Sequence, residues 1–252
     1  YKENFSPEYP GAVSIFINAV NRKSIYKKKI TIYGSTNYKK KLSRNYVNIP
    51  LSKKFLRSQS KDYVEKFINL NKKNRTDIIE IHNRPNYIKY LLTLETNLIL
   101  YFHNDPATME GSSKTKERIF LLGSCEKIVF NSEWSKKQFL KNLPQFYHKS
   151  KKLIVIHQSV SQKNINLKKK KKYIIFVGKL NSAKGFDIFS KAIVKILNKY
   201  SDWKAFIAGD EPREKISVTH KNLINLGFQN HNKILNLFEK SSIAVACSRW
   251  QE

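Results

Sequence analysis

Short apolar runs that end on a glycine or a histidine recur along this sequence, and they limit the fold more than any other feature. The clearest is the run 174–177, Ile-Ile-Phe-Val, which is rich in β-branched residues and stops at Gly178. Such a run is typical of a buried strand, and stretches with helical spacing of apolar residues separate one run from the next. Strands alternating with helices over this length predict an α/β fold with parallel sheets and right-handed crossovers.

The first 160 residues carry one alternation, and a second, incomplete one follows. Strands are expected at 30–34, 78–83, 98–103, 127–131 and 153–157, and helices at 13–22, 53–73, 86–93, 115–122 and from Ser132, an N-cap residue type. The basic stretch 161–172 separates the two alternations. We therefore expect a first domain at 1–160, a linker at 161–172 and a second domain at 173–252.

The composition is that of a globular protein with a large excess of basic residues. Hydrophobic residues make up 40% of the 252 residues, and the formal net charge is +29. The charge has two readings: an anionic partner such as nucleic acid or an acidic membrane surface, or compositional drift toward lysine, asparagine and isoleucine. The densest cluster, 168–172, is interpreted as a solvated linker. No apolar run reaches the ~18 residues that span a bilayer.

The two cysteines, Cys125 and Cys247, lie in different halves of the chain. Neither a disulfide between them nor a metal site built on two such thiols is expected. A reducing cytosol suits this pattern.

Loops at the carboxyl ends of parallel strands line the binding crevice of an α/β domain. This rule places Gly11, His82, His103 and Asn131 near the crevice of the first domain. A histidine at a strand end can equally be bonded to a backbone carbonyl, and that reading stays open.

Two lysines flank the loop that follows the clearest strand of the second domain. Lys179 comes directly after Gly178, and Lys184 directly before Gly185. Cationic side chains beside a helix N-terminus, outside the carboxyl end of a strand, are typical of a phosphate site. The alternative is a pair of solvated lysines in a lysine-rich chain.

These residues resemble the donor-binding half of family 4 (GT4-type) retaining glycosyltransferases with the GT-B fold, in which two Rossmann-like domains face a cleft. In that family Arg and Lys hold the diphosphate of a nucleotide sugar; Lys179 stands in the Arg position and Lys184 matches the Lys. Further landmarks of the family follow in order along the chain. They are the strand 203–208 with Gly209, the strand and loop 226–228, the helix 234–242 and the strand 243–247.

The resemblance also implies roles for the remaining site residues. Gly209 and Phe228 would lie at the donor nucleotide, and Glu252 would be the first Glu of a Glu-x7-Glu motif that contacts the donor sugar. His103 would contact that sugar near the anomeric centre. The second Glu lies beyond Glu252 and the chain does not begin with Met, so we expect a fragment cut at both ends, inactive by itself.

The other N-terminal matches are to loops of the same family. The segment 10–12, Pro-Gly-Ala, resembles its Gly-Gly-Ala loop, in which backbone amides such as that of Gly11 approach the donor phosphate. The loops at His82 and His103 resemble those of bacterial members that build surface polysaccharides. Asn131 lies in a segment similar to the family's Ser-x-Trp stretch, and His82 and Asn131 are assigned to the acceptor side.

The resemblance implies transfer of a sugar, with retention, from a nucleoside diphosphate to a cell-surface glycan or lipid-linked acceptor, as in lipopolysaccharide biosynthesis. No Asp-x-Asp motif is present to hold a metal, so we expect no metal and no cofactor besides the nucleotide sugar. For such an acceptor we expect a cytoplasmic protein that is peripheral on the inner face of the cytoplasmic membrane.

Other classes of function remain open. They are a nucleic-acid-binding protein, suggested by the charge but lacking a specific recognition element, a non-catalytic binding protein of the same fold, and a sugar-phosphate epimerase.

Overall fold

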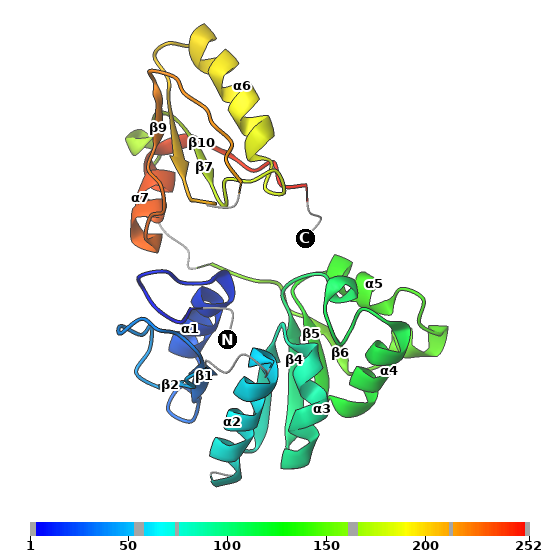
Figure 1. The fold of residues 1–252 in the computed structure, drawn as a ribbon. Coiled ribbons are helices and arrows are strands. Elements are labelled where there is room, and N and C mark those ends of the chain that lie inside the picture. Colours follow the sequence, from blue (N-terminus) through cyan, green and yellow to red (C-terminus); the bar gives the residue numbers. More distant parts are fainter. Residues whose placement is uncertain (1–3, 53–57, 74–75, 161–165, 212–213, 250–252) are drawn as a thin grey trace. The chain divides into compact units, whose positions relative to one another are not determined.

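The computed structural model describes residues 4–52, 58–73, 76–160, 166–211 and 214–249. The chain divides into two compact units, residues 1–160 and 161–251 (Figure 1). All paired strands of the described residues run parallel to one another, which confirms the α/β fold with parallel sheets. Cys125 in the first unit and Cys247 in the second are free thiols.

The first unit is built on a four-stranded sheet in the order β3-β4-β5-β6. These strands are β3 (Ile78–His82), β4 (Asn97–Phe102), β5 (Lys127–Phe130) and β6 (Leu153–Val155). The helices of the unit are α1 (Ala12–Lys23), α2 (Gln59–Lys73), α3 (Ile88–Leu91), α4 (Thr115–Ser124) and α5 (Glu133–Leu140), with short 3-10 turns at Pro85–Tyr87, Leu92–Leu94, Pro106–Thr108 and Gln145–Lys149. Strand order follows chain order, so every connection crosses in the same direction.

Alternation along the strands divides their side chains between a packed face and the face that carries the site. Phe102 of β4 and Phe130 of β5 are fully buried and stack, with ring centroids 5.7 Å apart. Phe139 of α5 packs on Phe130 at 5.3 Å. Because successive residues of a strand point to opposite faces, Tyr101 lies on the other side of β4.

The segment before this sheet differs most from the sequence-based expectation. β1 (Ile32–Gly34) pairs with β2 (Tyr46–Asn48) as a separate two-stranded sheet, and β2 was not predicted. Its sequence is polar, and side chains hold it in place: Asn45 donates to the carbonyl of Ile30 at 2.7 Å, next to the start of β1. The helix expected at 53–73 is described only from Gln59, because residues 53–57 lie outside the described ranges.

The second unit has a four-stranded sheet in the order β10-β7-β8-β9. Its strands are β7 (Lys171–Val177), β8 (Lys204–Ala208), β9 (Leu223–Asn225) and β10 (Ser241–Val245), its helices are α6 (Phe186–Lys199) and α7 (His231–Lys240), and a 3-10 turn covers Leu167–Lys169. The crossovers β7–β8 and β9–β10 run in opposite directions, so right-handed connections place α6 and α7 on opposite faces (Figure 1).

Helix α6 forms where it does because its apolar residues recur on one face. Phe186, Phe189, Ile193 and Leu197 are all buried, at the i, i+3, i+7, i+11 spacing of an amphipathic helix, and pack against Ile174 and Phe176 of β7 in one core. This helix fixes the position of the loop that precedes it.

Several boundaries in the second unit differ from the expected ones. α7 begins at His231 rather than 234, because the Asn230 side chain accepts a hydrogen bond from the amide of Lys233 at 3.0 Å and caps the helix. β10 accordingly covers Ser241–Val245 instead of 243–247, and β9 ends at Asn225, before the segment 226–228. β7 begins at Lys171, so the last two residues of the expected linker belong to a strand.

No helix within the described ranges is both long enough and apolar enough to cross a bilayer.

Candidate functional site

Three glycines mark the carboxyl edge of the second sheet. The amide of Gly178, after β7, donates to the carbonyl of Ala208 at 3.0 Å, and the amide of Gly209, after β8, donates to Gly227 at 2.9 Å. A Cβ on Gly209 would lie 1.8 Å from the carbonyl oxygen of Gly178, and the φ of Gly209 is +145°. Only glycine fits there, so the backbones of neighbouring strand ends approach each other closely.

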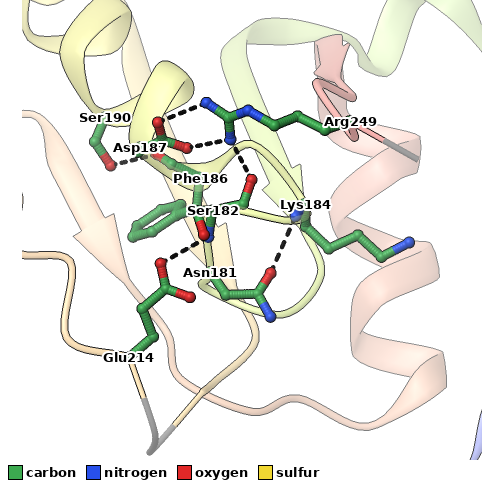
Figure 2. A network of polar contacts seen from close by, with 8 residues as sticks. All are labelled: Asn181, Ser182, Lys184, Phe186, Asp187, Ser190, Glu214 and Arg249. Atoms are coloured by element: carbon green, nitrogen blue, oxygen red, sulfur yellow. Dashed lines mark hydrogen bonds and ion pairs between the residues drawn. The ribbon is translucent and has the colours of Figure 1, made fainter.

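The loop between β7 and α6 carries Lys179 and Lys184 and is held by its own polar contacts. The Asn181 side chain accepts from the amide of Lys184 at 3.0 Å, and the Asn181 carbonyl accepts from the amide of Phe186 at 3.1 Å (Figure 2). Gly185 caps α6 with φ +71°, and a Cβ there would lie 2.0 Å from the carbonyl oxygen of Cys247. Lys179 is exposed and Lys184 is half-buried.

An acidic side chain accepts a hydrogen bond from one backbone amide of this loop. Glu214 Oε1 accepts a hydrogen bond from the amide of Ser182 at 3.0 Å (Figure 2). An exposed loop amide is a donor that an anion could use. In this structure the carboxylate of Glu214 takes that position.

Arg249 ties the segment after β10 to the start of α6. Its guanidinium makes two parallel bonds to the Asp187 carboxylate, of 2.7 and 2.8 Å, and also donates to the carbonyl of Ser182 (Figure 2). The Arg249 amide donates to the carbonyl of Ala183 at 3.0 Å. The hydrogen bond from Arg249 lowers the pKa of Asp187 to about 2, so this carboxylate is ionised at neutral pH.

The remaining donor-side residues of the sequence analysis are distributed as follows. Gly209 lies directly after β8, next to Gly178, and Phe228 lies three residues beyond β9 with 38% of its surface exposed. Both are therefore at the same edge of the sheet as the lysine loop. Glu252, assigned to the donor sugar, lies outside the described residues.

In the first unit, His82, His103 and Asn131 come together at the carboxyl edge of the sheet. They follow or end β3, β4 and β5, three adjacent strands. His82 Nδ1 lies 2.8 Å from His103 Nε2, and the Asn131 side chain donates to the carbonyl of His103 at 3.0 Å. These three predicted residues therefore lie together at one edge of the first sheet.

The contacts of the two histidines extend on both sides. His82 Nε2 lies 2.8 Å from Glu80 Oε1, and His103 Nδ1 lies 2.7 Å from the amide nitrogen of Gln158. The backbone amide of His103 donates to the side chain of Asn83 at 2.7 Å, and Asn83 has a φ of +53° that turns the chain after β3. Both ring nitrogens of His103 thus have partners within this unit.

Aromatic rings enclose the histidines and make their surroundings apolar. The Tyr101 ring stacks on His103 at 4.4 Å, and Phe16 of α1 meets the same imidazole edge-on at 5.0 Å. Burial, and next the proximity of His82, lower the pKa of His103 to about 3, although Glu80 opposes this. The hydrogen bond from His82 holds the pKa of Glu80 below its usual range. At neutral pH His103 is uncharged and Glu80 is ionised.

Sequence reasoning missed Glu80, Tyr101 and Gln158. Residues two apart on a strand share a face, so Glu80 lies with His82, and Tyr101 with His103. The register pairs His82 directly with Tyr101. The Glu-x-His and Tyr-x-His spacings could have indicated the first two residues, but no signal indicated Gln158, which is 55 residues from His103.

Gly11 occupies the N-cap position of α1 with φ −75°, a conformation open to other residues. Its amide donates to the carbonyl of Asn4 at 3.2 Å. The backbone donor expected to approach a phosphate is therefore used inside the first unit.

Comparison with protein families gave a match for the C-terminal part of the chain. Residues 157–252 match the family Glycosyl transferases group 1. A search of curated proteins gave no match.

Solved structures with a similar fold include HepE, WaaB and TarM. HepE from Anabaena, in complex with UDP-glucose, matches with a TM-score of 0.71 at 12% identity, over 100% of this chain and 73% of HepE. The lipopolysaccharide outer core galactosyltransferase WaaB in its apo form gives 0.56 at 14% identity, over 96% of this chain and 71% of WaaB. TarM gives 0.54 at 10% identity, and the chain spans 41% of its length. The fold is thus close to that of GT-B glycosyltransferases such as HepE and WaaB.

Proposed function

We propose that this protein is a glycosyltransferase that moves a sugar from a nucleoside diphosphate to an acceptor hydroxyl. The observation that carries the proposal is the loop between β7 and α6. It bears Lys179 and Lys184, is bounded by Gly178 and Gly185, and lies in the segment that matches the group 1 glycosyltransferases. HepE, whose fold this chain shares, holds UDP-glucose.

The chemistry proposed for this loop is stabilisation of the departing diphosphate. Lys179 and Lys184 supply positive charge, and the dipole of α6, whose N-terminus follows this loop, favours an anion in the same place. A lysine at 179 gives a point charge instead of the two-pronged fork of an arginine. The absence of an Asp-x-Asp sequence supports transfer without a bridging metal, and retention of configuration is proposed from the resemblance to family 4 enzymes.

The roles proposed for the other residues follow the same resemblance. His103 and Glu252 would contact the donor sugar, Gly209 and Phe228 the nucleotide, and Gly11 the phosphate. His82 and Asn131 would lie toward the acceptor. The contact of His82 and Asn131 with His103 supports a common site for these three residues.

The acceptor proposed is a cell-surface glycan or a lipid-linked sugar at the inner face of the cytoplasmic membrane. WaaB acts in the lipopolysaccharide outer core, which supports this class of acceptor. The turn after α1 also supports it. Ile25 and Tyr26 are 86% and 62% exposed there and stand among Arg22, Lys23 and the exposed lysines 27–29, a pattern suited to an anionic lipid surface.

The first test, made on the natural full-length protein, is thermal stabilisation by UDP-, GDP-, ADP- and dTDP-sugars, followed by release of the nucleoside diphosphate in the presence of EDTA. Lys184→Ala should weaken binding of the active donor about 10- to 100-fold, the loss of one charge-assisted contact. The matched control is Lys191→Ala, an exposed lysine on α6 that lies outside the loop.

Two outcomes would reject the proposal. Stabilisation without release of diphosphate would indicate a non-catalytic binding protein. No response to any donor, together with salt-resistant binding of a nucleic acid, would favour the alternative suggested by the charge of +29.

A further inference from the structure

Four side chains form a continuous hydrogen-bonded row at the carboxyl edge of the first sheet. The row runs from Glu80 to His82 (2.8 Å), from His82 to His103 (2.8 Å), and from His103 to Gln158 (2.7 Å). Glu80 and Gln158 are exposed, whereas 8% of the His103 surface is accessible. The row therefore begins and ends at the surface and passes through a buried imidazole.

The positions of the hydrogens in this row follow one after another from the carboxylate of Glu80. An ionised carboxylate only accepts hydrogen bonds, so His82 Nε2 must donate to Glu80. In the arrangement with one hydrogen on each imidazole, Nδ1 of His82 is then the acceptor, and His103 Nε2 carries the hydrogen between the two rings. His103 Nδ1 is left with a lone pair, which accepts from the amide group of Gln158.

We propose that Glu80 and His82 are positioning residues that fix the tautomer of His103, so that its Nδ1 accepts a hydrogen bond from a ligand hydroxyl. The ligand hydroxyl replaces the amide of Gln158, an exposed residue beyond β6 that covers Nδ1 in this structure. A lone pair at Nδ1 attracts an O–H group and repels a phosphate oxygen. The inference rests on the proposed function, because it assigns this position to a sugar hydroxyl and not to the diphosphate.

The surroundings of the row make the tautomer choice matter. The imidazole of His103 is stacked on Tyr101 and makes a T-shaped contact with Phe16, and it is buried. Its pKa is depressed by burial, so it stays neutral at ordinary pH. A neutral imidazole has one donor and one acceptor, and the negative charge at Glu80 decides which nitrogen is which.

The test is nitrogen NMR of the histidine rings in the ligand-free protein, which distinguishes a protonated from an unprotonated ring nitrogen. In the wild type His103 should carry its hydrogen on Nε2. In Glu80→Gln, whose amide can donate as well as accept, the Nε2–H preference of His103 should be lost. The spectrum of His148, whose Nε2 faces the carbonyl of Leu143, should not change.

A matched control keeps the loss of a carboxylate separate from the loss of the row. Glu126→Gln removes an exposed carboxylate just before β5, at the opposite end of that strand from Asn131. It should leave the His103 spectrum as in the wild type. Hydrogen on Nδ1 of His103 in the wild type, or an unchanged spectrum in Glu80→Gln, would overturn the role of Glu80 and His82 whether or not the protein transfers sugars.

The ligand is tested by adding UDP-glucose or UDP to the same samples. UDP-glucose should shift the Nδ1 signal of His103 and UDP should not, because only the sugar offers the hydroxyl. In the natural full-length protein, Glu80→Gln should raise the KM for the donor about three- to tenfold, the loss of one hydrogen bond. An equal shift with UDP alone, or stabilisation by UDP-glucose without any shift, would overturn the hydroxyl assignment.

Discussion

His82 Nδ1 and His103 Nε2 lie 2.8 Å apart although 21 residues separate them in the chain. Parallel pairing of β3 with β4 creates this contact, because it sets His82 beside Tyr101 and brings the end of one strand next to the end of the other. One hydrogen lies between two ring nitrogens at that distance, so which nitrogen of His103 carries its hydrogen depends on His82. Any substitution of His82 is therefore expected to act on His103 as well.

Gly209→Ala should destabilise the second unit by about 1–3 kcal/mol, since the new methyl group would clash with the backbone of Gly178 and neither strand end can move freely. Urea unfolding followed by fluorescence measures the change. Gly123→Ala is the matched control, because no atom lies within 4 Å of a Cβ there and the residue is inside α4. That variant should be stabilised by about 0.5–1 kcal/mol. Equal behaviour of the two variants would contradict the close approach at Gly209.

The Arg249–Asp187 pair should make stability depend on acid pH. The pKa of Asp187 is lowered to about 2 by Arg249, below the ordinary value of about 3.9 in an unfolded chain. The pair's contribution is therefore complete above about pH 4 and is lost as the pH falls toward 2. Asp187→Asn should lower Tm at neutral pH and flatten its fall between about pH 4 and 2. Asp77→Asn, an exposed carboxylate before β3, should keep the wild-type slope.

Much of this arrangement could be predicted from local sequence. Ser132 was expected to cap a helix, and its hydroxyl accepts from the amide of Ser135 at 3.1 Å, at the start of α5. The end of β7 at Gly178 was expected from a β-branched run that stops at glycine. In both cases the residues that determine the structure lie within a few positions of one another.

The contacts that complete the two sites could not be predicted in this way. Arg249 meets Asp187 across 62 residues, and Gln158 meets His103 across 55. Such pairs depend on how strand ends are brought together, which no local pattern encodes. β2 was missed for a related reason, because its polar residues are held by side chains such as Asn45 and not by a buried apolar face.

Glu214→Gln should strengthen the binding of a nucleoside diphosphate. The carboxylate of Glu214 occupies the amide of Ser182, which a phosphate could otherwise use, and a negative charge there repels the diphosphate. Removing the charge should lower the Kd for UDP several-fold, which corresponds to about 1 kcal/mol of binding free energy. Titration calorimetry at two salt concentrations measures this, and the gain should shrink at high salt. Glu239→Gln on α7 is the control, and a weaker complex in Glu214→Gln would show that the residue supports the loop instead.

Replacing Ile25 and Tyr26 together by serine should weaken binding to vesicles that contain phosphatidylglycerol. The two side chains are 86% and 62% exposed, and no acidic residue occurs in the sequence between Glu8 and Asp62. The lysines supply long-range attraction and the two apolar side chains enter the interface, so their loss should cost about 1.4 kcal/mol or more, roughly tenfold in affinity. The charge of the protein is unchanged in this variant, which separates insertion from simple attraction.

Phe146→Ser removes an equally apolar side chain, 68% exposed, from a part of the first unit far along the chain, and should bind like the wild type. Binding to duplex DNA should be the same in all three proteins. Equal vesicle binding by all three would mean that lysine charge alone brings this protein to lipid, and that the turn after α1 has no special part in it.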